Sequence, residues 1–64
     1  MKLSTIINRL EKLHPDLQHV GWDGVSAFLV FYNADHSMET NEFKEGSETH
    51  ILMVKFENKM FNLG

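Results

Sequence analysis

Apolar residues near the amino-terminal end recur every three or four positions. This spacing places them on one face of a helix and the polar residues between them on the other, the apolar set being Leu3, Ile6, Ile7, Leu10 and Leu13. Ser4 has the hydroxyl of a typical N-cap, and Pro15 discourages continuation of a helix. The pattern predicts one amphipathic helix over residues 4–14.

The segment that follows fits two interpretations. Residues 15–22 form either a short second turn of helix ending at Gly21, or a strand over residues 18–22 that leads into a turn at Asp23-Gly24. An aspartate-glycine pair tolerates the positive φ angles that a tight hairpin turn requires. This favours the strand.

The rest of the chain has the composition of short strands. Val25–Tyr32 is rich in β-branched and aromatic residues, Thr49–Glu57 has a similar pattern, and Asn58-Lys59 resembles a turn into residues 60–63. Glu39–Phe43 is a weaker strand candidate. The prediction is a single α+β domain over residues 1–64, with one N-terminal amphipathic helix packed on an antiparallel sheet of three to five strands.

The predicted central strand is apolar on both faces. Because successive strand side chains point to opposite faces, Phe28 and Val30 lie opposite Ala27, Leu29 and Phe31. The same alternation in the carboxy-terminal strand places Ile51 and Met53 together on one face. A helix of about 11 residues spans roughly 16 Å and covers one face of such a sheet, so we expect the second face to need another cover.

Three covers are consistent with the sequence. Met38 and Phe43 fold back over the second face, a second copy of the chain packs on it, or a different protein does. Trp22 is either an interface anchor or, as we favour for a small domain, the lid of the core. The predicted partner-binding surface comprises Trp22, Phe28, Val30, Tyr32, Ile51 and Met53.

The amino-acid composition limits the kinds of chemical site that the chain can form. With 64 residues and no cysteine, the chain forms neither disulfides nor thiolate zinc sites, and no run approaches the roughly 20 apolar residues of a membrane helix. Its four histidines have no recognised metal-ligand spacing, and no nucleophile or phosphate-loop motif is present. We therefore expect no enzyme activity, metal or cofactor, and a soluble protein of the cytoplasm.

The formal charge of −3 comes mainly from one segment. Residues 35–48 contain a single lysine, Lys44, against five carboxylates: Asp35, Glu39, Glu42, Glu45 and Glu48. Six scattered basic residues neutralise phosphates poorly, which argues against direct nucleic-acid binding. The acidic run is either a solvated segment or, as an alternative function, a mimic of a phosphate backbone.

The first 24 residues, MKLSTIINRLEKLHPDLQHVGWDG, resemble the opening of short phage and prophage accessory proteins. In those proteins Met-Lys and a leucine-rich helix precede Pro-Asp, a strand and a turn. The resemblance implies a protein that binds and alters a host protein, and it assigns a role to no particular residue. The sequence thus predicts a small protein-binding module acting in the host cytoplasm, with a homodimer as one form. The alternatives are the acidic mimic and a structural subunit of a larger assembly.

Overall fold

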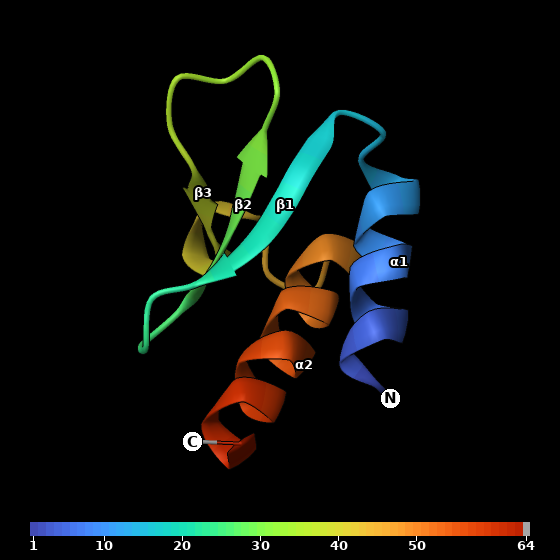
Figure 1. Ribbon diagram of the computed structural model, residues 1–64, viewed down its shortest axis with the longest axis vertical. Helices are drawn as coiled ribbons and strands as arrows, with labels where there is room; N and C mark the ends of the chain where they lie inside the picture. The colour runs from blue at the N-terminus through green and yellow to red at the C-terminus, as the bar shows by residue number, and fades with distance from the viewer. Residues whose placement is uncertain (64) are drawn as a thin grey trace.

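The computed structural model describes residues 1–63 and shows a three-stranded antiparallel sheet together with two helices (Figure 1). The predicted α+β class and strand number are confirmed, whereas the prediction of only one helix is wrong, since a second helix ends the described chain. Along the chain the elements are α1 (Leu3–Leu13), β1 (Leu17–Trp22), β2 (Ala27–Phe31), β3 (Met38–Glu39), the 3-10 helix η1 (Thr40–Glu42) and α2 (Glu48–Leu63).

Helix α1 confirms the periodicity of its sequence. Ile6 and Leu10 are fully buried, and the helix ends where the His14 N–H donates to the Leu10 carbonyl at 2.9 Å, directly before Pro15. The predicted N-cap was wrong, because Lys2 holds that position without a side-chain hydrogen bond and Ser4 lies inside the first turn. Burial of the apolar face therefore stabilises α1 more than capping does.

Strands β1 and β2 form the predicted hairpin, so the strand interpretation of residues 18–22 is confirmed. In the turn, Asp23 Oδ1 accepts hydrogen bonds from the backbone N–H groups of Val25 and Ser26, each at 2.8 Å, and Gly24 has φ +95°. This is the left-handed conformation for which glycine is suited. A bulge at Gln18 interrupts the pairing near the other end of β1.

The weak strand predicted over Glu39–Phe43 is mostly absent. β3 contains two residues, and the chain then enters η1. A reciprocal capping box joins Glu39 and Glu42, in which the Glu39 N–H donates to Glu42 Oε2 at 2.7 Å. This local hydrogen bonding ends the strand early.

The carboxy-terminal segment is a helix of 16 residues, α2, so the predicted strands over Thr49–Glu57 and residues 60–63 were wrong. The His50 N–H donates to Ser47 Oγ at 3.2 Å, which caps the first turn directly after Gly46 at φ +86°. Five residues at helical spacing face the rest of the fold, and this period prevails over strand propensity: Thr49, Leu52, Met53, Phe56 and Met60.

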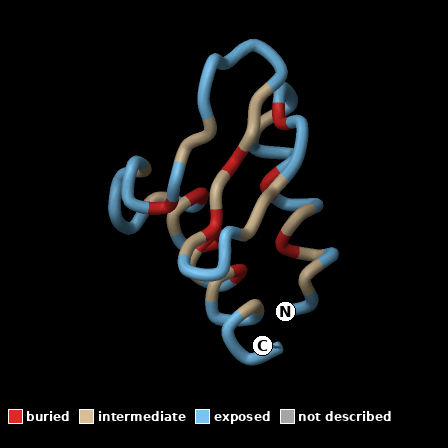
Figure 2. Tube along the Cα trace, turned by 60° about the vertical axis from the view of Figure 1, so that its left-hand side comes forward, coloured by how far each residue is buried: buried red, intermediate tan, exposed pale blue. Residues whose placement is uncertain are grey.

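Both helices pack on the same face of the sheet. The core consists of residues from α1, from one face of β1 and β2, and from α2: Ile6, Leu10, Leu17, Ala27, Leu29, Leu52, Met53 and Phe56. From Ala27 to Val30 along β2, buried and half-buried residues alternate (Figure 2). The domain therefore has two layers, with helices on one side of the sheet and no element on the other among residues 1–63.

Candidate protein-binding surface

The sheet face that points away from the helices is the outer face. The strand register places His19 and Gly21 of β1, Phe28 and Val30 of β2, and Glu39 of β3 on it. Phe28 and Val30 are half-buried, although no helix or strand lies over them in the described part of the chain. On this face, the Phe28 ring contacts His19 and Gly21 of the neighbouring strand β1.

The Phe28 ring lies over Gly21, which has no side chain to displace it. A Cβ atom built on Gly21 would overlap the ring of Phe28, so the ring occupies the space above this glycine. On the same face, the His19 ring meets the Phe28 ring edge-on, with centroids 6.5 Å apart. An aromatic ring covering a glycine in a neighbouring strand stabilises the sheet and fixes the ring before any partner arrives.

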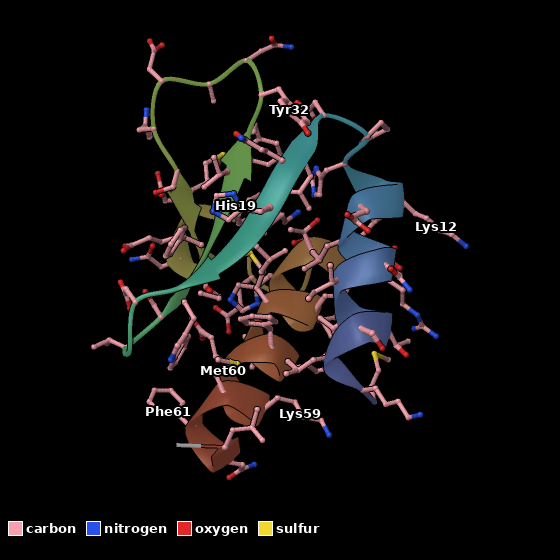
Figure 3. The ribbon with its side chains drawn as sticks, viewed as in Figure 1. Lys12, His19, Tyr32, Lys59, Met60 and Phe61 are labelled. Atoms are coloured by element: carbon pink, nitrogen blue, oxygen red, sulfur yellow. The ribbon has the colours of Figure 1, made fainter. Side chains whose placement is uncertain are left out.

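Two other predicted surface residues, Tyr32 and Trp22, differ in their relation to the outer face. Tyr32 follows β2 and is 68% exposed, whereas Trp22 is half-buried and packs on the core with its ring 4.9 Å from that of Phe61. Figure 3 shows Tyr32 and Phe61 at opposite ends of the molecule. Tyr32 thus lies beside the outer face, at the end of the hairpin away from the Asp23-Gly24 turn. Trp22 covers the core, which is the interpretation that the sequence analysis favoured.

Ile51 and Met53 do not lie on the outer face, which corrects the predicted surface. Both belong to α2, where Met53 is fully buried in the core and Ile51 is 46% exposed on the helix layer. The expected grouping assumed a period of two residues, and the helical period separates the pair.

The predicted intramolecular cover is also absent. Met38 pairs with Leu29 and lines a groove of about 320 Å³ with Phe31, Phe43 and His14. Phe43 packs against the core cluster. Both side chains therefore lie on the helix side of the sheet, and Phe28 and Val30 receive no cover from them.

Three of the five acidic residues are placed by local structure. Glu39 and Glu42 accept each other's backbone N–H groups in the capping box, and Glu48 lies in the first turn of α2, where the helix dipole favours a carboxylate. Glu45 lies in the turn before that helix, and Asp35 in the loop after β2. All five are exposed, as expected for a solvated segment.

Charge is distributed unevenly between the layers. Five of the six basic residues lie in the helices or directly before them: Lys2, Arg9, Lys12, Lys55 and Lys59. In Figure 3, Lys12 and Lys59 project from the helices and His19 from the sheet. Residues 14–47 carry six carboxylates against Lys44 alone. The sheet and its loops are therefore the acidic side of the molecule.

Two polar contacts were not foreseen from the sequence. Glu57 Oε2 on α2 accepts hydrogen bonds from the Ala27 backbone N–H and from the Thr40 hydroxyl, both at 2.7 Å. His14 Nε2 is hydrogen-bonded to Thr49 Oγ1 at 2.8 Å. No local sequence signal predicts either contact, because each joins residues that are 17 or more positions apart.

Within residues 1–63, no three histidine or carboxylate side chains gather in a way that holds a metal ion. In the same range, every buried side-chain nitrogen or oxygen has a hydrogen-bond partner, so no orphaned polar group points into a cavity. The outer face remains the candidate site.

Comparisons with protein-family models, with curated proteins and with solved structures found no match to this chain. The resemblance of residues 1–24 to phage accessory proteins therefore stays a prediction. None of the helices in the described residues has the length and apolar character required to cross a membrane.

Proposed function

We propose that this chain is a protein-binding module that receives, on the outer face of its sheet, an apolar and basic-rimmed surface of another protein. One observation carries the proposal. Phe28 and Val30 stand on a sheet face that no element of residues 1–63 covers. Antiparallel sheets commonly present a polar face to water, so two adjacent large apolar side chains on the free face indicate a binding surface.

The outer face is ordered before a partner binds. Phe28 is fixed between Gly21 and His19, so little side-chain entropy is lost when a partner covers it. Tyr32 at the end of β2 supplies the kind of exposed aromatic that interfaces favour. A stable interface buries about 800 Å² per partner, so the contact extends from the outer face to its surroundings.

The charged residues around the outer face indicate the charge of a complementary partner. Glu39 lies on the outer face beside Phe28, and the loops next to it carry Asp23 and Asp35. A partner with lysine or arginine side chains around an apolar centre complements this arrangement, and long-range attraction speeds its association. The acidic residues thus support the apolar contact. A phosphate mimic would need them as its main contact, although Glu39 and Glu42 are already engaged with each other.

The resemblance of residues 1–24 to phage and prophage accessory proteins supports the same mode of action, binding and altering a host protein. We place this action in the host cytoplasm, where a protein with no cysteine needs no oxidising environment to fold.

A matched pair of substitutions tests the proposal. Val30→Asp puts a charge on the outer face, whereas Val25→Asp changes a side chain that is 75% exposed at the hairpin turn. Tagged wild type and both variants, checked for folding by circular dichroism, are incubated with lysate of the source cells, and bound proteins are quantified by mass spectrometry. We expect a bound protein that Val30→Asp loses and Val25→Asp retains.

The same experiment distinguishes the alternatives. Bound proteins that are identical for the two variants would overturn the proposal. Binding lost on Glu39→Lys, strongly weakened by salt and indifferent to Val30→Asp would favour the acidic mimic instead.

A further inference from the structure

Strand β1 has a free edge with a defined hydrogen-bonding pattern. It pairs only with β2 in the described sheet. In an antiparallel pair, residues that exchange hydrogen bonds alternate with residues whose backbone groups point outward. The bonds from Asp23 N–H to the Ser26 carbonyl, at 3.3 Å, and from Tyr32 N–H to the Asp16 carbonyl, at 3.0 Å, fix the phase of this alternation. It follows that the backbone groups of Val20 and Trp22 point away from β2.

Glu57 provides an independent check on this phase. Ala27 is the register partner of Trp22, and its N–H donates across the other side of β2 to Glu57 Oε2. Trp22 and Ala27 therefore form a pair without mutual hydrogen bonds. Two N–H groups and two carbonyls, those of Val20 and Trp22, remain at the edge of β1.

The two edges of the sheet differ in how they are protected from pairing with a further strand. At one edge, β3 is only two residues long. Beyond its end, the Ala27 N–H of β2 donates a hydrogen bond to Glu57. β1 has six residues, LQHVGW, and contains no lysine, carboxylate or proline, the residues with which proteins normally protect an edge from pairing. The bulge at Gln18 is its one irregularity. The sequence leaves this edge open.

We propose that β1 pairs in antiparallel orientation with β1 of a second copy of this chain, about a two-fold axis at Gly21. In this register Val20 lies opposite Trp22 of the second copy, and the two residues exchange backbone hydrogen bonds on both sides of the axis. The proposal goes beyond the partner-binding function above and does not depend on it.

Complementarity between a histidine and a carboxylate selects a second copy as the occupant. The register places His19 opposite Asp23 of the second copy, and the symmetry repeats this pair. Both residues belong to pairs without backbone hydrogen bonds across the new junction, in which side chains approach closely. Two backbone hydrogen bonds to Asp23 from Ser26 and Val25 keep its carboxylate available as an anion.

The product is a continuous six-stranded sheet. Its free face carries both copies of Phe28 and Val30, on β2 strands that are separated by the two copies of β1, since the outer faces of both chains point the same way. Pairing also adds buried surface to a domain whose core consists of eight apolar residues, a size at which oligomerisation is a common source of stability.

Sedimentation equilibrium of the purified chain at pH 6 tests the proposal. We expect the wild type to dimerise. Val20→Pro removes an outward N–H and leaves the backbone hydrogen bonds to β2 in place, so we expect a folded monomer, whereas Val30→Asp on the outer face stays dimeric. The result for Val30→Asp separates this proposal from the partner-binding function. A wild type that is monomeric at about 1 mM, or a dimer that survives Val20→Pro, would overturn it.

Two further measurements cover the case in which proline prevents folding. Hydrogen exchange of the wild type should show the amides of Val20 and Trp22 protected at high protein concentration and exposed at low concentration. His19→Asp should weaken the dimer by at least about tenfold by placing like charges opposite each other, and His19→Lys should preserve it. Exchange at Val20 and Trp22 that does not depend on concentration would contradict the pairing.

Discussion

His14 and Thr49 join the end of α1 to the start of α2, with the imidazole Nε2 at 2.8 Å from the threonine hydroxyl Oγ1. The His14 ring also contacts two aromatic rings, edge-on to Phe31 at 5.6 Å and tilted against Phe43 at 6.1 Å. Four segments therefore meet at one side chain that is itself only partly exposed.

This junction gives a first prediction. His14→Ala removes the hydrogen bond and both ring contacts, so we expect it to lower the free energy of unfolding by about 1–3 kcal/mol in urea denaturation. Thr49→Val keeps the shape of the side chain and removes only the hydroxyl. If the bond matters, the double variant costs less than the sum of the single ones. Additive losses would mean that His14 acts through its aromatic contacts alone.

Glu57 gives a second prediction. Glu57→Ala leaves the Ala27 N–H and the Thr40 hydroxyl without their shared acceptor, and we expect a loss of about 1–3 kcal/mol of unfolding free energy. Thr40→Val serves as the control, because it leaves the bond between Ala27 and Glu57 in place and should cost less. Equal losses for the two variants would show that Glu57 does not close the sheet edge.

Gly21 gives a third prediction. Gly21→Ala introduces a Cβ where the Phe28 ring lies, and the ring has to rotate away into solvent. We expect a loss of about 1–3 kcal/mol in thermal or chemical unfolding, typical of overpacking. On a Phe28→Ala background the same substitution should cost little or improve stability, since alanine suits a strand better than glycine. A loss that persists on that background would locate the strain in the backbone.

Asp23 gives a prediction about pH. Backbone hydrogen bonds from Ser26 and then Val25 lower the pKa of its carboxyl below the usual 3.8. A depressed pKa in the folded state means that the contribution to stability is present above pH 3.8 and is lost as the pH falls through the folded pKa. Asp23→Asn should therefore be less stable than the wild type at pH 6, and the difference should shrink at lower pH. A difference that does not vary with pH would exclude the charge as its source.

Local signals in the sequence predicted α1 and the hairpin well. The spacing of Ile6 and Leu10 has one helical interpretation, and Asp23-Gly24 provides its own turn geometry. For α2, the run Ile51–Val54 is apolar at every position, so a strand and a helix fit it equally. The N-cap position of Ser47, directly after Gly46, is the signal that distinguishes the helix from a strand.

The candidate surface was predicted in part for the same reason. Phe28 and Val30 belong to a strand that the sequence identifies, and their common face followed from it. Ile51 and Met53 were grouped with them through the wrong period. The hydrogen bonds of Glu57 depend on where α2 lies in three dimensions, which a local pattern does not contain.

The late position of α2 in the chain has a consequence during synthesis. The strands pair over short sequence distances, as Trp22 does with Ala27, and such hairpins form within about 1–10 μs. Leu52, Met53 and Phe56, by contrast, reach the core only after the ribosome has released α2. Until then the nascent hairpin exposes Ala27 and Leu29 on one side and Phe28 and Val30 on the other. A nascent chain of this kind exposes apolar side chains on both faces of the hairpin, so chaperones compete for it until α2 packs on the core.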